Sequence, residues 1–91
     1  MIVKQSGIFR RRVKKLYPPQ KKALDAAIEV IMKNPEIGEP KTGDLAGVQV
    51  YKYKFQSQQY LLAYRFVKEQ LALTLLALGT HENFYRDLKK Q

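Results

Sequence analysis

The first part of the chain carries apolar residues at the spacing of two successive helices. Residues 2–4 are a short β-prone run, and Ser6 follows as a residue able to cap a helix. Apolar side chains then recur at intervals of three and four positions, so each set falls on one helical face. Prolines at 18 and 19 separate the two sets, and Asn34-Pro35 ends the second. The pattern predicts a helical hairpin with both apolar stripes facing one side. The stripes are Phe9, Val13, Leu16 and Tyr17, and then Leu24, Ala27, Ile28 and Ile31.

From residue 48 onward the apolar positions alternate, which is the period of a β-strand. The preceding residues, 36–47, show neither period and are expected to form a loop. The last of three predicted strands is apolar on both faces, as in the middle of a sheet. Gly79 ends that strand, and Thr80 can cap a final helix. The predicted strands span residues 48–55, 60–66 and 71–78, with polar turns at 56–59 and 67–70.

This order of elements (β-α-α-β-β-β-α) predicts a single α+β domain over residues 1–91. An N-terminal strand and a helical hairpin would pack on an antiparallel sheet, because helices segregated from a run of strands form a layer on it. The tyrosines at 51, 53, 60 and 64 fall within the strand patterns. We therefore expect them to pack in the core rather than to stack on RNA. The pattern leaves open which strand pairs with the N-terminal one.

Charge adds information about partners. The chain has 17 Lys and Arg against 8 Asp and Glu, a net charge of +9, and residues 1–22 contain no acid. Such an imbalance indicates a polyanionic partner, which could be nucleic acid, an anionic membrane surface or an acidic protein. The alternative is that the cations only solvate helix faces, although solvated faces usually mix both signs.

The apolar runs and the N-terminus give an expectation about location. The longest nearly apolar run, residues 71–78, is too short to span a bilayer, which takes about 20 residues. The N-terminus turns polar before any run that resembles a signal peptide. We therefore expect a soluble, cytoplasmic protein with no membrane partner.

Several kinds of chemistry find no support in the sequence. There are no cysteines and one histidine, which argues against a disulfide framework and against a zinc site. No glycine-rich phosphate loop or serine nucleophile elbow is present, and the carboxylates are scattered rather than grouped as in a two-metal nuclease. We expect no cofactor and no metal, so any phosphodiester cleavage would have to use bases and cations.

Two pairs of residues could carry such chemistry. Lys52 and Lys54 lie two apart on a predicted strand, so both point to one face and could bind a phosphate. Alternatively, they solvate that face and discourage pairing with another chain. His81 and Tyr85 lie one turn apart in the final helix and could take part in acid–base catalysis. Alternatively, His81 supports the first helical turn and Tyr85 packs on the sheet.

Three segments, residues 44–55, 60–65 and 78–85, follow one another in the order DLAGVQVYKYKF, YLLAYR and LGTHENFY. Together they resemble the RelE/ParE superfamily of toxins from bacterial type II toxin–antitoxin systems, with the RelE-like branch favoured. Residues 44–55 (DLAGVQVYKYKF) resemble the "L-x-G … Y-K-I-K" stretch of RelE-like toxins. Residues 60–65 (YLLAYR) are similar to their next strand, "Y-R-L-V-Y", and residues 78–85 (LGTHENFY) to the closing "G-x-[RH]-x-x-x-Y" segment. The resemblance covers nearly the whole chain in the same order, and it implies a RelE-like fold.

The resemblance implies a ribosome-dependent mRNA endoribonuclease, or mRNA interferase, that cuts mRNA in the ribosomal A site without a metal. Inhibition of translation and growth arrest would follow. The 2′-hydroxyl would attack the adjacent phosphorus, with Lys52 and Lys54 activating it and stabilising charge on the phosphate. His81 would assist the leaving 5′-oxygen, and Tyr85 would stack on or orient a base.

One position departs from the family. Leu61 stands where RelE-like toxins commonly have an arginine, and Arg65, on the same strand face, lies about 13 Å along the strand. This departure keeps a second interpretation open, in which the chain is a ParE-like, non-enzymatic inhibitor of DNA gyrase. A third interpretation is a non-toxic basic module that binds nucleic acid.

The resemblance also implies partners. These are the ribosome and mRNA, or alternatively DNA gyrase, together with a cognate acidic antitoxin that folds on the basic surface. Contacts to RNA that depend on phosphate neutralisation should weaken steeply as salt rises. The cations expected to contact ribosomal RNA are Arg10, Arg11, Arg12, Lys14, Lys15, Arg65 and Arg86.

Overall fold

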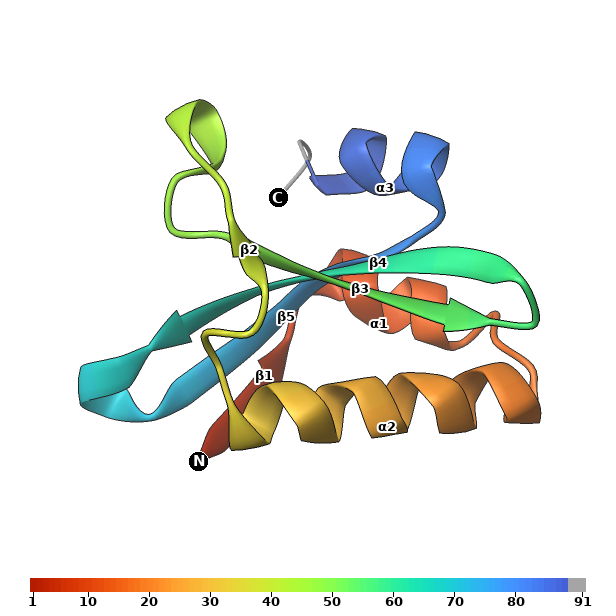
Figure 1. The fold of residues 1–91 in the computed structure, drawn as a ribbon, viewed down its shortest axis with the longest axis horizontal. Coiled ribbons are helices and arrows are strands. Elements are labelled where there is room, and N and C mark those ends of the chain that lie inside the picture. The colour runs from red at the N-terminus through yellow and green to blue at the C-terminus, as the bar shows by residue number, and fades with distance from the viewer. Residues whose placement is uncertain (89–91) are drawn as a thin grey trace.

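The structure, a computed structural model, describes the backbone of residues 1–88 and the side chains of residues 1–81, 84, 85 and 88. Its helices are α1 (Gly7–Val13), α2 (Pro18–Lys33) and α3 (His81–Leu88), and its strands are β1 (Ile2–Gln5), β2 (Glu39–Pro40), β3 (Gln49–Phe55), β4 (Gln58–Val67) and β5 (Ala72–Gly79). Helices cover both faces of the sheet, with α1 and α2 on one side and α3 on the other (Figure 1). The α+β class and the predicted element order are confirmed, with one short strand added.

The five strands form one sheet in the order β1-β5-β4-β3-β2. β1 pairs with β5 in parallel, and the other three pairs are antiparallel. The sheet is therefore antiparallel as predicted except at the N-terminal strand, whose partner the sequence left open. The predicted loop over residues 36–47 contains the two-residue strand β2 and a short 3-10 turn, Gly43–Leu45. β2 lies at the sheet edge, where Pro40 is tolerated because no further strand needs its backbone donor.

The helical hairpin is confirmed, but its first helix is shorter than predicted. α1 ends at Val13, whereas the predicted apolar stripe continues to Tyr17. Tyr17 has extended backbone angles (φ −87°, ψ 165°), as expected for a residue that precedes proline. α2 then begins at Pro18, where the missing backbone N–H costs no hydrogen bond. Leu16 still packs against the core from the connecting turn.

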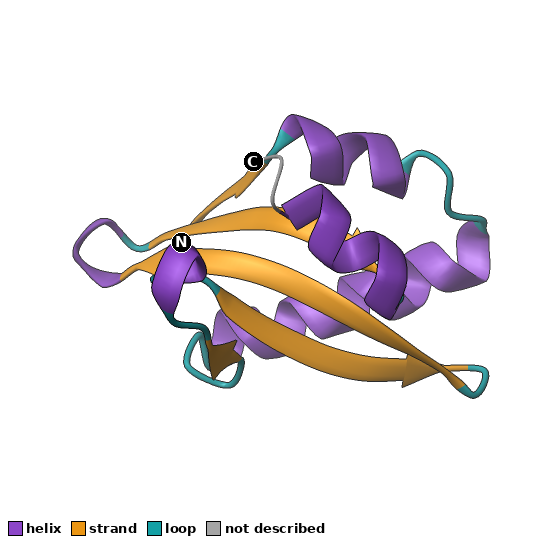
Figure 2. Ribbon diagram, turned by 90° about the horizontal axis from the view of Figure 1, so that it is seen from above, coloured by secondary structure: helices purple, strands orange, loops and turns teal. Residues whose placement is uncertain are grey.

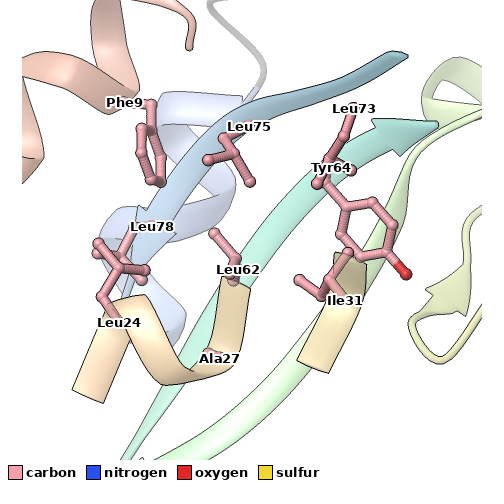
Figure 3. Close-up of a cluster of buried hydrophobic side chains, with 9 residues drawn as sticks. All are labelled: Phe9, Leu24, Ala27, Ile31, Leu62, Tyr64, Leu73, Leu75 and Leu78. Carbon is pink, nitrogen blue, oxygen red and sulfur yellow. The ribbon is translucent and has the colours of Figure 1, made fainter. Parts of the chain in front are cut away.

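The main core lies between the hairpin and the sheet. Figure 3 shows Phe9 of α1 and three residues of α2 facing side chains from β4 and β5. The half-buried rings of Tyr51, Tyr53 and Tyr60 extend this cluster along β3 and β4, and Tyr64 is fully buried in it. The predicted core role of the four strand tyrosines is therefore confirmed. The buried members of the cluster are Phe9, Leu24, Ala27, Ile31, Leu62, Tyr64, Leu73, Leu75 and Leu78.

A second core lies on the opposite face, beneath α3. In Figure 2, α3 crosses the strands on the near side while α2 runs on the far side. Ala63 pairs with Ala77 and Tyr64 with Leu75, so Leu76 is left without a partner in β4 and forms a bulge. The buried members of the second core are Val48, Val50, Leu61, Ala63, Leu76, Ala77, Phe84 and Leu88.

None of the helices in the described part of the chain has both the length and the apolar character that are needed to span a bilayer.

Candidate active site

The register of three strands brings the predicted site residues toward one another. Lys52 of β3 pairs with Leu61 of β4, and Leu61 pairs with Gly79 at the end of β5. Neighbouring strands lie about 4.8 Å apart, so this row spans about 10 Å from Lys52 to Gly79. Two residues after Gly79 the chain begins α3 with His81. His81 therefore lies next to the Gly79 end of this row of paired residues, and Lys52 lies at the other end.

The space between these elements is a hollow of about 260 Å³, lined by Lys52, Gln58, Gln59, Leu61, His81 and Tyr85. Leu61 is 3% exposed and belongs to the core under α3, so it forms an apolar floor. The Lys52 and His81 side chains are exposed and supply the ionisable groups of the described lining. In the described part of the chain, no group of three histidine, aspartate, glutamate or cysteine side chains could hold a metal ion.

Tyr85 is held by its neighbours in α3. Its ring lies 5.2 Å from the His81 ring, centroid to centroid, in an edge arrangement, and 4.9 Å from the Phe84 ring. Phe84 is fully buried in the core under α3, and Tyr85 packs against that core while it also lines the hollow. The predicted shared face of His81 and Tyr85 is therefore present. The packing role that was the alternative for Tyr85 is present as well.

Lys54 lies beside the hollow rather than in its lining. It is exposed and pairs with Gln59, which is two residue pairs beyond the Lys52–Leu61 pair in the ladder. Lys52 and Lys54 share the α3 face of β3, since Val48 and Val50 of the same parity pack under α3. The structure thus brings Lys52, His81 and Tyr85 around one hollow, with Lys54 adjacent to it.

Two glutamines of the lining, Gln58 and Gln59, lie where the sequence predicts a polar turn over residues 56–59. Only Gln56 and Ser57 form the turn, and both have left-handed backbone angles, with φ values of 50° and 69°. A two-residue turn of this kind matches the twist of paired strands. β4 therefore already begins at Gln58, and Gln59 is placed opposite Lys54. The length of the turn between β3 and β4 could have identified them, because a turn of two residues places both Gln58 and Gln59 in the following strand.

Residues 3–89 match the family model of the ParE-like toxin of type II bacterial toxin–antitoxin systems. The chain belongs to this family. The match includes nearly the whole toxin, so the membership of the RelE/ParE superfamily that the sequence resemblance predicted is confirmed. No curated protein matches the sequence.

Solved structures of RelE toxins share the fold of this toxin. A double arginine-to-alanine mutant of Escherichia coli RelE in the free state superposes with a TM-score of 0.73 at 20% identity, covering 98% of this chain and 94% of that chain. A chain of the intact E. coli RelBE toxin–antitoxin complex gives 0.71 at 20% identity, with coverage of 89% and 96%. A chain of the RelBE2 complex from Mycobacterium tuberculosis gives 0.67 at 26% identity, with coverage of 88% and 96%. The RelE-like fold is thereby confirmed.

The remaining predicted cations of the toxin do not gather at the hollow. α1 packs through Phe9 on the same side of the sheet as α2, opposite to α3. Arg65 is exposed near Gly47, since a Cβ added at Gly47 would lie 3.6 Å from its Nε atom. The side chain of Arg86 lies outside the described residues. The exposed predicted cations of α1 and the following turn are Arg10, Arg11, Lys14 and Lys15, while Arg12 is half-buried and has an interaction partner.

Two tyrosines of the toxin have altered acidity, and both lie away from the hollow. Burial raises the pKa of the Tyr53 phenol far above its usual range, and the neighbouring Tyr60 adds to the effect. Burial also raises the pKa of Tyr64, partly offset by the hydrogen bond from the Gly38 backbone N–H. Both rings belong to the core under the hairpin, so these shifts reflect packing and not catalysis.

Proposed function

We propose that the toxin is a ribosome-dependent mRNA endoribonuclease that inhibits translation. The observation that carries the proposal is the shared hollow of Lys52, His81 and Tyr85, with Lys54 beside it. An ammonium or amine group and an imidazole that line one small space can act on the two oxygens of a single phosphodiester. An aromatic side chain in the same space can hold an unpaired base by stacking.

In this reaction the 2′-hydroxyl oxygen bonds to the adjacent phosphorus while the bond from phosphorus to the 5′-oxygen breaks. One lysine of the Lys52–Lys54 pair, as the neutral amine, accepts the hydroxyl proton, and the ammonium group of the other stabilises the charge that develops on the phosphate. His81 donates a proton to the leaving 5′-oxygen. The products are a 2′,3′-cyclic phosphate and a free 5′-hydroxyl. In this proposed route each transferred proton has a donor or an acceptor among the named residues.

The charge distribution supports a ribosomal setting and an acidic partner. The α1 cations lie on the far side of the sheet from the hollow, so they can contact RNA phosphates while the hollow holds mRNA. The E. coli and M. tuberculosis structures with this fold include toxin–antitoxin complexes. We propose that a cognate acidic antitoxin covers the basic surface of this toxin and keeps it inactive in the cytoplasm.

A second candidate function is inhibition of DNA gyrase without catalysis. The specific observation that favours it is Leu61, an apolar and buried floor at the position where RelE-like toxins commonly place an arginine. A guanidinium aimed at the phosphate is a major source of transition-state stabilisation, and none of the described side chains that line the hollow is an arginine. The family model is also described as ParE-like.

The deciding experiment is primer extension on mRNA translated by purified ribosomes with added toxin, run in parallel with a DNA gyrase supercoiling assay. We expect cuts within A-site codons and no effect on supercoiling. Lys52→Ala should lower the cleavage rate about 100-fold or more, because it removes a charge that acts in the transition state. His81→Ala and Lys54→Ala should have smaller effects of about 10- to 100-fold.

The matched control is Lys68→Ala, which removes an exposed lysine from the 3-10 turn after β4 and should leave cleavage unchanged. Inhibited supercoiling with intact mRNA would support the gyrase alternative instead. Full cleavage by the Lys52→Ala and His81→Ala variants would show that the hollow is not the active site.

A further inference from the structure

The lining of the hollow is suited to more than a phosphate. Lys52 and His81 can meet an anion, but Leu61 and Tyr85 offer apolar surface and Gln58 and Gln59 offer neutral amides. A phosphate alone gains little from an apolar floor, because it is charged on all of its free oxygens. A nucleobase has flat apolar faces and a polar edge, which is the pattern of this lining.

Gln59 is the amide best placed to meet that polar edge. It lies two positions before Leu61 on β4 and pairs with Lys54, so it shares the strand face of the hollow floor. The Gln58 amide donates from Nε2 to the Gln59 backbone oxygen at 3.3 Å. Within the described part of the chain, the side-chain amide of Gln59 makes no hydrogen bond, so both its donor and its acceptor are available.

The position of Gln59 is fixed by the hairpin. The turn before it has two residues, Gln56 and Ser57, both with left-handed angles, and pairing resumes at once between Phe55 and Gln58. A side chain on a paired strand next to a short turn is held more closely than one on a loop. The Cα and Cβ atoms of Gln59 are therefore held at a fixed position relative to the Lys52–Leu61 pair, within reach of the hollow that its side chain lines.

We infer that the hollow binds the base of one unpaired RNA nucleotide and that Gln59 recognises this base, with a preference for adenine. A glutamine amide can donate to and accept from the same base edge, and adenine offers it a matching acceptor and donor. Leu61 and Tyr85 hold the faces of the base, and Lys52 meets the phosphate attached to it. The hollow, about 260 Å³, has room for one nucleotide rather than for a folded element. The identification of the ligand as RNA rests on the proposed nuclease function.

The test measures binding without ribosomes. The wild-type toxin labelled with ¹⁵N is titrated with four 2′-O-methyl tetranucleotides, each of a single base, which cannot be cleaved because the attacking hydroxyl is blocked. We expect the adenine tetranucleotide to bind about tenfold more tightly than the uracil one, the effect of one well-formed pair of hydrogen bonds. Gln59→Leu should reduce this ratio to less than twofold while leaving uracil binding within twofold of wild type.

Two further variants sharpen the result. Gln59→Glu replaces the amide donor by a second acceptor and should move the preference from adenine toward cytosine, which offers a donor. Gln70→Leu removes an exposed glutamine from the 3-10 turn between β4 and β5, at the other end of β4, and should keep the wild-type preference. Because Gln59 is exposed, its substitutions should not affect folding.

Equal binding of all four tetranucleotides by the wild type, binding of none, or an unchanged preference in Gln59→Leu would overturn the inference. The ribosome assay reports separately on the proposed function. A toxin that prefers adenine through Gln59 but cuts no mRNA would retain the inference and refute the nuclease. If the toxin cuts mRNA and Gln59→Leu keeps the wild-type base preference, the proposed nuclease function is retained and the inference about Gln59 is refuted.

Discussion

A single phenol oxygen ties the loop after α2 to the sheet, and its removal gives a quantitative test of the fold. The Tyr64 side chain is fully buried, and its Oη atom donates to the Pro35 backbone oxygen at 2.6 Å. The same oxygen accepts a hydrogen bond from the Gly38 N–H at 2.8 Å. A Cβ at residue 38 would lie 2.6 Å from this oxygen, so only glycine permits the approach. Tyr64→Phe removes both hydrogen bonds and changes little else.

The expected cost follows from the two backbone groups left behind. Gly38 is buried, so water cannot readily replace the lost acceptor, and a buried unsatisfied group costs about 1–3 kcal/mol. The Pro35 carbonyl is half-buried and can recover part of its loss from solvent. We therefore expect Tyr64→Phe to lower the free energy of unfolding by about 2–4 kcal/mol. For a domain of this size that corresponds to a fall in Tm of about 10–20 °C.

Urea unfolding followed by circular dichroism measures this change, provided that the slope of the free energy with denaturant stays the same. The matched control is Tyr60→Phe. Tyr60 is half-buried, and its hydroxyl accepts one hydrogen bond, from the Gln20 amide at 3.2 Å. That variant should lose less than about 1 kcal/mol. If both variants unfold at the same urea concentration as wild type, the assignment of these hydrogen bonds is wrong.

Three further predictions concern the turn, the buried phenols and the hollow. Replacing Gln56 by Asn and Ser57 by Gly should raise the free energy of unfolding by about 1 kcal/mol in urea titrations, because this pair is favoured in left-handed turns; lower stability would contradict the turn geometry. Phenolate absorbance should show Tyr53 and Tyr64 ionising above pH 10, the usual pKa of a phenol being about 10. Stability should fall as the pH rises above about 10, since the unfolded chain loses these protons first; ionisation of Tyr53 and Tyr64 at about pH 10 would refute this. Leu61→Arg should raise the rate of A-site cleavage at least about tenfold, because it adds a guanidinium to the hollow, and should lower the free energy of unfolding by about 1–3 kcal/mol. A folded variant that cuts no faster than wild type would count against the nuclease function.

Local signals in the sequence were sufficient for most of the fold. The prolines at 18 and 19 separate α1 from α2, and the change to alternating apolar positions marks β3 and β4. The same signals could not give the parallel pairing of β1 with β5, because that register depends on contacts between segments far apart in the chain. They also missed β2, since a strand of two residues has no period of its own and exists only through its pairing with β3.

The candidate site was predictable as a set of residues but not as an arrangement. Strand and helix spacing singled out Lys52, Lys54, His81 and Tyr85, and the resemblance to RelE-like toxins implied their roles. The structure brings three of them around the hollow. The position of Lys54 outside the lining depends on how far the strand continues past the Lys52–Leu61 pair, which the sequence does not state. The position of Gln59 in β4 likewise follows from the two-residue length of the turn before it.

The hollow exists because β5 changes its alternation before it reaches α3. In β5, Leu73 and Leu75 face the helical hairpin, and strict alternation would also turn Ala77 to that side. The bulge at Leu76 instead places Ala77 under α3 and Leu78 under the hairpin. The residue after Leu78 then falls on the α3 face, and that residue is Gly79, which pairs with Leu61 and has no side chain beside it. Ser6 supports the bulge by donating to the Leu76 oxygen at 2.8 Å while it caps α1. A serine at the start of the chain thus helps to hold the strand geometry that leaves the hollow open.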